Sequence, residues 1–166
     1  MQIRIRATGA VMYEAEFRAY QKANGGPTWD TTTDAVLTAL GADVVFEGPQ
    51  ATGGTVYQTS VYGGIEQIEG KWYTKWNLGP SFFDTEDAEG NVTTAAQNEA
   101  AYKAAKDAEQ AANVRNSRTQ MLKDSDWTQL ADSTVDKEVW ATYRTALRDV
   151  PTQAGFPWTI EWPVAP

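Results

Sequence analysis

Cysteine and histidine are both absent from the 166-residue chain. The lack of cysteine excludes disulfide bonds, thiolate catalysis and zinc sites built from cysteine. The lack of histidine removes the commonest general base at neutral pH and the commonest ligand of transition metals. We therefore expect no enzymatic activity, no cofactor and no bound metal, and we assign no catalytic residues.

Long apolar runs and an excess of positive charge are also lacking. No stretch reaches the roughly 18 consecutive apolar residues typical of a membrane-spanning helix. The net charge of −8 repels nucleic-acid phosphates and anionic membranes, so neither is expected as a partner. The N-terminal residues MQIRIRATG carry positive charge with no apolar segment after them, so we predict synthesis in a cytoplasm without a secretory signal.

The first part of the chain carries strand-like and helix-like patterns in close succession. Polar and apolar residues alternate over residues 2–7, which predicts a half-buried strand. Apolar residues then recur at helical spacing, which predicts helices from Met12 to Lys22 and from Thr32 to Leu40. We expect Asp30 or Thr31 to cap the second helix.

Strand-like patterns follow these helices. Glu69-Gly70 separates the last two of them and is typical of a hairpin turn. Residues 1–77 are therefore predicted to form a small module of mixed sheet and helices. The predicted strands after the helices cover residues 44–46, 55–62, 65–68 and 71–76.

Residues 78–92 are rich in glycine, proline and carboxylates, which predicts an acidic linker. Their acidic run resembles a calcium-binding loop in composition. However, Ala88 occupies a position at which an EF-hand loop needs an oxygen ligand. We therefore interpret the run as a solvated turn.

A long helix is predicted next, from Thr93 to about Leu122, with Thr93 or Thr94 as its cap. Its alanines form a stripe at three- and four-residue spacing, which suits either packing on the protein's own body or contact with a partner or a second copy. Both interpretations stay open, and contact with a second copy would make the protein a homo-oligomer. The stripe consists of Ala101, Ala104, Ala105, Ala108, Ala111 and Ala112.

Two shorter helices complete the predicted helical region, residues 93–150. One begins at Trp127, and the other runs from about Val135 to Asp149 after the capping run Asp132-Ser133-Thr134. We expect Arg144 to stack on Trp140 and Arg148 to reach a carboxylate. Ion pairs that pin the helical hairpin are expected among Arg115, Arg118, Asp124, Asp126 and Asp132.

Residues 151–166 combine aromatic residues with prolines, which predicts an extended, polyproline-like tail. Burying its large apolar side chains is worth on the order of 20 kcal/mol at about 25 cal/mol per Å². Ordering the segment costs roughly 18 kcal/mol, so the two terms nearly cancel. The tail therefore suits closure of the protein's own core or insertion into another protein, and less well a ligand groove. The whole sequence predicts an α+β fold.

The C-terminal half also carries a family resemblance. It rests on Arg115-x-x-Arg118, Ser125-Asp126-Trp127, Tyr143-Arg144, Leu147-Arg148-Asp149-Val150-Pro151, Gly155-Phe156-Pro157-Trp158 and Trp162-Pro163. This succession resembles the C-terminal region of bacteriophage tail assembly chaperone-like proteins, and residues 1–50 resemble their front end more weakly. The resemblance implies binding to a phage tail, baseplate or tail-fibre protein in the host cytoplasm during assembly, or a place in the virion.

Three functions follow as hypotheses. The first is a non-enzymatic assembly protein that contacts its partner through Trp140, Tyr143, Arg144, Arg148, Phe156, Trp158 and Trp162. The second is a structural virion subunit held by the N-terminal sheet and the alanine-rich helix. The third is a glycan-binding module in which Trp72, Tyr73 and Trp76 stack on sugars.

Overall fold

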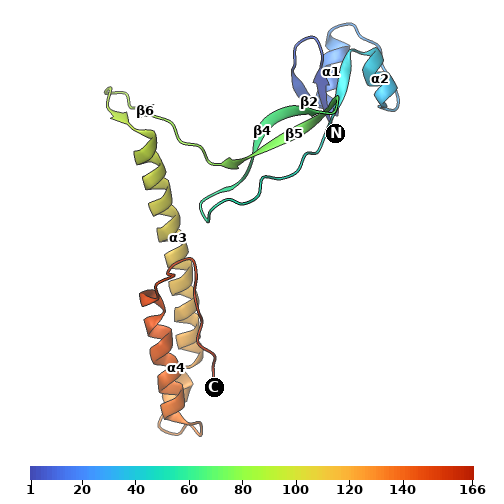
Figure 1. The fold of residues 1–166 in the computed structure, drawn as a ribbon. Coiled ribbons are helices and arrows are strands. Elements are labelled where there is room, and N and C mark those ends of the chain that lie inside the picture. Colours follow the sequence, from blue (N-terminus) through green and yellow to red (C-terminus); the bar gives the residue numbers. More distant parts are fainter. The chain divides into compact units, whose positions relative to one another are not determined.

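The computed structural model describes all residues, Met1 to Pro166, and they divide into two compact units, Met1–Ser81 and Phe82–Pro166. The first unit holds a mixed five-stranded sheet with two helices, and the second holds a long helix followed by a shorter one (Figure 1). The predicted α+β class is therefore confirmed. None of the helices combines the length and apolarity needed to span a membrane.

The sheet of the N-terminal unit has the strand order β2-β1-β3-β5-β4, in which only β3 and β5 run parallel. One face of it packs on the two helices. The buried core comprises Ile3, Ile5, Phe17, Leu37 and Ala42. The elements are β1 Gln2–Ile5, β2 Val11–Tyr13, α1 Glu14–Ala23, α2 Asp34–Ala39, β3 Ala42–Phe46, β4 Thr59–Ile68 and β5 Lys71–Gly79.

Both helices of this unit begin later than predicted. Helix α1 begins at Glu14 because the residues before it pair with β1 as the edge strand β2. Helix α2 is capped by Thr33, whose hydroxyl accepts a hydrogen bond from Val36 N. The expected caps, Asp30 and Thr31, lie in the loop before α2. This loop is tied to α1, because the Arg18 guanidinium donates a hydrogen bond to the Asp30 carbonyl.

The strands predicted over residues 55–62 and 65–68 form one strand, β4, with an irregularity between Tyr62 and Ile65. It begins only at Thr59, so the first four residues of the predicted strand lie outside it. At the irregularity, Gly64 adopts φ +102°, so the glycine pair makes a bulge instead of ending the strand. The Glu69-Gly70 turn between β4 and β5 is confirmed, and both of its residues have positive φ, as tight hairpins require.

Helices dominate the C-terminal unit. Thr94 caps α3 (Ala95–Asp124) with its hydroxyl, which confirms one of the two predicted caps. The 3-10 helix η1 (Asp126–Gln129) follows α3 and leads into α4 (Lys137–Asp149). Asp136 caps α4, so that helix begins two residues later than predicted and the run from Asp132 stays outside it.

The acidic run predicted to be a solvated turn lies within a small β-hairpin. Strands β6 (Thr85–Glu86) and β7 (Val92–Thr93) pair antiparallel. The Asp87 carboxylate closes the loop by accepting hydrogen bonds from Glu89 N, Asn91 N and Asn91 Nδ2. These bonds, first that from the Asn91 side chain, lower the pKa of Asp87.

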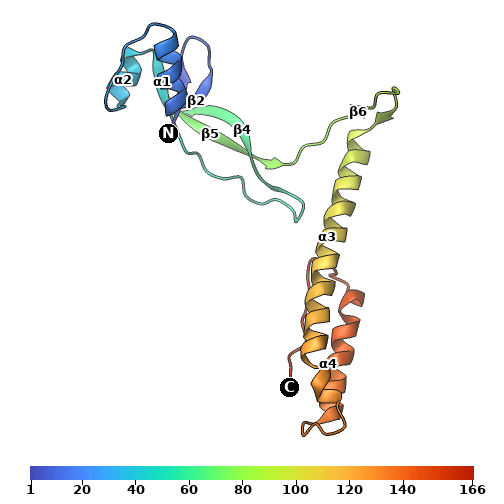
Figure 2. The same cartoon turned by 180° about the vertical axis from the view of Figure 1, so that it is seen from behind.

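The tail is less extended than predicted. The 3-10 helix η2 (Val150–Thr152) continues directly from α4. Turns then follow, because the Gly155 carbonyl accepts hydrogen bonds from Trp158 N and Thr159 N. Only residues 160–166 run without turns, beside α3 and α4 (Figures 1 and 2).

Candidate partner-binding surface of the C-terminal unit

Arg144 fixes α4 to the end of α3. Its side chain is about nine-tenths buried, and it donates hydrogen bonds of 2.7 Å to the Leu122 carbonyl, 2.8 Å to Ser125 Oγ and 2.7 Å to Asp126 Oδ1. A guanidinium at a helix C-terminus satisfies carbonyls that lack partners within the helix, and its charge complements the helix dipole. The expected stacking on Trp140 is thus replaced by a contact with α3.

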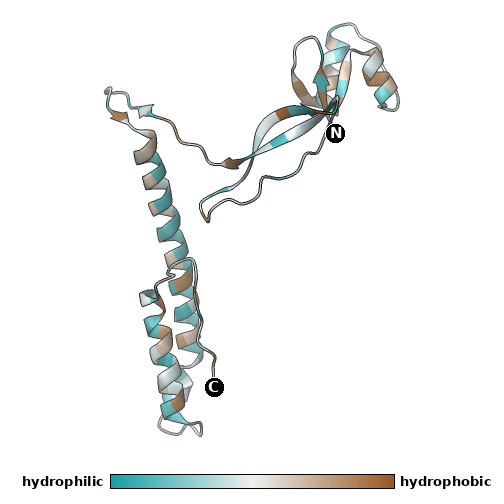
Figure 3. Ribbon diagram, viewed as in Figure 1, coloured by the Kyte–Doolittle hydropathy of each residue, from teal (hydrophilic) through white to brown (hydrophobic).

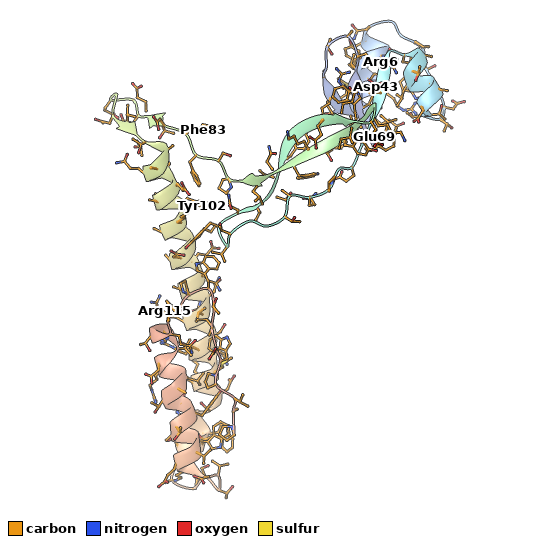
Figure 4. All side chains as sticks on the ribbon, in the orientation of Figure 1. Arg6, Asp43, Glu69, Phe83, Tyr102 and Arg115 are labelled. Carbon is orange, nitrogen blue, oxygen red and sulfur yellow. The ribbon has the colours of Figure 1, made fainter.

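The ion pairs of this unit also differ from those predicted. Asp126 pairs with Arg144 instead of with an arginine of α3. Arg115 extends from α3 (Figure 4). Its guanidinium carbon lies over the Phe156 ring, 5.2 Å from the ring centroid. Arg118 buries its Nε without a hydrogen-bond partner, and Asp132 is exposed. The hairpin is therefore pinned by one arginine of α4.

Three aromatic side chains, which we call the aromatic row, run from η1 onto α4. The ring centroids of Trp127 and Trp140 are 6.1 Å apart, and those of Trp140 and Tyr143 are 5.6 Å apart at an angle of 89°. Trp127 is 50% exposed although it is a large apolar residue. Leu130 and Val139 are also exposed. Exposed apolar surface is therefore presented by Trp127 at one end of the row and by Leu130 and Val139.

A groove of about 360 Å³ adjoins the aromatic row. Tyr143 belongs to both, since it is one of the residues that line the groove. We call the aromatic row and this groove together the hairpin surface. The groove is lined by Val139, Thr142, Tyr143 and Ala146 from α4 and by Pro163, Val164 and Pro166 from the end of the chain.

The sequence pattern does not predict Trp127, Leu130 or Val139 as contact residues. Trp127 begins a predicted short helix and belongs to the family resemblance, but its approach to Trp140 depends on the loop between η1 and α4. Spacing within a single helix carries no signal for such a contact.

The aromatic tail residues lie against their own chain. Trp158 Nε1 donates a 2.6 Å hydrogen bond to Asp107 Oδ1 of α3, and Phe156 lies under Arg115. Gln153 and Glu161 exchange two hydrogen bonds that bring both ends of the turn region together. Trp162 is half-buried, and Arg148 is exposed on α4. Of the predicted contact residues, Trp140, Tyr143 and Arg148 remain the most available on the helix.

The aromatic residues proposed for glycan stacking do not form one platform. Side chains alternate along a strand, so Trp72 and Trp76 face one side of β5 and Tyr73 faces the other. The Arg4 guanidinium carbon lies 4.1 Å from the Trp72 ring centroid, and Tyr73 packs on Phe46. The predicted group of three is therefore divided between the two faces of the sheet.

Across the chain, no three acidic side chains gather in an arrangement that would hold a metal ion. The pKa values of Glu14, Asp87 and Glu109 are lowered by hydrogen bonds, of which the first come from Thr32, Asn91 and Lys106, respectively. Glu14 is partly buried, and the other two carboxylates are exposed.

The C-terminal part of the chain matches a known protein family. Neither the curated proteins nor the solved structures include a match to this chain. Residues 111–166, which contain Arg144, the aromatic row and the groove, match the family described as phage tail assembly chaperone protein. The resemblance noted in the sequence is confirmed over this segment, and the C-terminal part of this chain is similar to phage tail assembly chaperones.

Proposed function

We propose that the protein is a non-enzymatic phage assembly factor that binds a tail, baseplate or tail-fibre subunit through the hairpin surface. The observation that carries the proposal is the aromatic row, of which Trp127 is 50% exposed, within the segment similar to phage tail assembly chaperones. Large aromatic side chains contribute disproportionately to binding energy when a partner covers them. We infer that a partner covers the exposed Trp127 ring.

The surface is organised before the partner arrives. Ring contacts hold Trp140 against Trp127 and Tyr143, and Arg144 fixes the helix that carries two of these rings. Binding therefore orders few additional side chains, which lowers its entropic cost. Arg144 acts as a positioning residue in this proposal, while Arg148, which is exposed, contributes to the polar rim.

The tail has two parts in the proposal. Its aromatic part lies against the protein's own chain through Phe156, Trp158 and Trp162. The last residues, of which Val164 is 90% exposed, form one wall of the groove and contact the partner directly. The aromatic tail therefore works mainly by building the groove.

Co-purification tests this function. The full chain is immobilised and exposed to extract from phage-infected cells, and bound tail subunits are identified by mass spectrometry. Trp127→Ala should reduce recovery of the bound tail subunit at least about tenfold, in line with the loss of one aromatic hot spot. Phe83→Ala is the matched control, because Phe83 is 74% exposed in the same unit outside the hairpin surface. Equal recovery with both variants contradicts the proposal.

A structural virion subunit is the second candidate. It is favoured by the alanine stripe of α3, because Ala101, Ala104, Ala105 and Ala108 are exposed and suit close packing against a second copy. Hydrophilic and weakly hydrophobic colours alternate along this helix (Figure 3). Mass spectrometry of purified virions separates the candidates. An assembly factor acting in the host cytoplasm is absent or scarce there, whereas a structural subunit is present in fixed stoichiometry.

A further inference from the structure

The N-terminal unit contains a groove of about 630 Å³, a volume typical of ligand sites. It lies on the sheet face that turns away from the core. Gln2 alternates with the buried Ile3 along β1, and it pairs with Tyr13, so both face this side. Thr74 and Trp76 of β5 line the same groove.

Three aromatic residues line this groove. Tyr13 comes from β2 and is 60% exposed, and Tyr62 comes from β4 and is 50% exposed. Trp76 meets Tyr62 edge to face, with ring centroids 6.0 Å apart. The groove therefore offers electron-rich ring surface that the chain's own side chains leave exposed.

The charged groups that line the groove are all acceptors. They are the carboxylates of Glu16 and Glu47, and Gln2 Oε1 is buried without a hydrogen-bond partner. One Glu16 oxygen caps α1 by accepting from Tyr13 N. The Thr74 hydroxyl already accepts from Gly48 N and Trp76 Nε1.

No lysine or arginine lines the groove. The combination of carboxylates and aromatic rings suits a group with positive charge and several donors. A neutral saccharide would stack on the rings but leave the negative charge uncompensated. An apolar side chain would desolvate the Glu16 and Glu47 carboxylates without offering them a hydrogen bond, which costs free energy.

We propose that this groove binds an arginine side chain presented by a partner protein. The guanidinium stacks on the aromatic lining and donates hydrogen bonds to the carboxylates of Glu47 and Glu16, for which its planar array of five N–H donors is suited. The net charge of −8 attracts such a partner over a longer range. This inference concerns the N-terminal unit and does not rest on the function proposed for the hairpin surface.

Titration of the full chain with N-acetyl-arginine amide, followed by NMR, tests the inference. The matched ligand is N-acetyl-citrulline amide, which has nearly the same shape but no charge. We expect the arginine derivative to shift signals of β2 and β5 and the citrulline derivative to bind at least about fivefold more weakly, since a cation–π contact and charge-assisted hydrogen bonds are lost. Equal binding of the two, or binding of neutral oligosaccharides in place of both, overturns the inference.

Two variants assign the binding to this groove. Glu47→Gln and Tyr62→Ala should each weaken binding of the arginine derivative at least about threefold. Glu66→Gln is the control, because Glu66 is a half-exposed carboxylate of the same sheet that pairs with Lys75 outside the groove. The NMR spectrum reports whether each variant keeps its fold. Unchanged affinity in both folded groove variants also overturns the inference.

Discussion

The Arg144 guanidinium donates a 2.7 Å hydrogen bond to the carbonyl of Leu122, a residue 22 positions earlier in the chain. This bond joins the middle of α4 to the last turn of α3. The same side chain reaches Asp126 at the start of η1, next to Trp127. The position of the aromatic row therefore depends on this one arginine.

Replacing Arg144 with methionine should destabilise the C-terminal unit by about 2–4 kcal/mol, because its buried partners lose a charged donor. Urea denaturation, monitored by tryptophan fluorescence, measures the change. Asp126→Asn serves as the comparison. Asp126 is 64% exposed, so its loss of charge should cost less than about 1 kcal/mol. A loss below about 0.5 kcal/mol for Arg144→Met would show that the contact does not stabilise the hairpin.

Trp158→Phe removes the hydrogen bond to Asp107 while keeping an aromatic ring at this position of the tail. We expect the free energy of unfolding to fall by about 1 kcal/mol, as is usual for one lost side-chain hydrogen bond. Hydrogen exchange should also quicken at the amides of residues 153–161, since the bond anchors this segment to α3. Trp127→Phe, at an exposed site, is the control and should leave both measurements nearly unchanged.

The acidic hairpin should lose structure at low pH. Hydrogen bonds, first from the Asn91 side chain, lower the folded-state pKa of Asp87 below its ordinary value of 3.8. Because the folded-state pKa is lowered, the ionised Asp87 carboxylate stabilises the hairpin fully above the unfolded-state pKa. This stabilisation is lost as the pH falls through the folded-state pKa. NMR titration of the Asp87 carboxyl and exchange of the Asn91 amide measure this directly. A midpoint at or above the ordinary value would contradict the geometry of the loop.

Gly48→Ala should destabilise the N-terminal unit by about 2 kcal/mol, because a Cβ at this position would lie 2.0 Å from the Thr74 carbonyl oxygen. It also disturbs the hydrogen bond from Gly48 N to Thr74 Oγ1. Glu47→Gln, one residue earlier and exposed, should leave the stability unchanged. Equal stability of the two variants would show that β3 and β5 tolerate separation at this point.

Local patterns in the sequence predicted most elements of the fold. Thr94, for example, begins a capping box with Gln97, and its cap is visible in the order of the residues alone. The Glu69-Gly70 turn is equally local. Helix α2 begins later than its pattern indicated because contacts with Arg18 hold the preceding loop. Contacts between segments that are distant in the sequence cannot be predicted from the local pattern of residues.

The candidate surface was predictable only in part. Trp140 and Tyr143 share a helix and were selected by their spacing, whereas Trp127 joins them across a loop. Arg144 lies one turn after Trp140, a spacing that predicts stacking of its guanidinium on the indole, whereas the structure buries it against the end of α3. Its burial depends on where α3 ends, and the sequence indicates that end only to within a few residues.

Hydrogen exchange of the full chain, with and without the tail subunit that it captures, tests most directly whether the partner binds the hairpin surface. We expect slower exchange on complex formation in peptides that cover residues 127–143 and 160–166, with little change in residues 1–40. Slower exchange confined to the N-terminal unit, with residues 127–143 unaffected, would contradict binding through the hairpin surface.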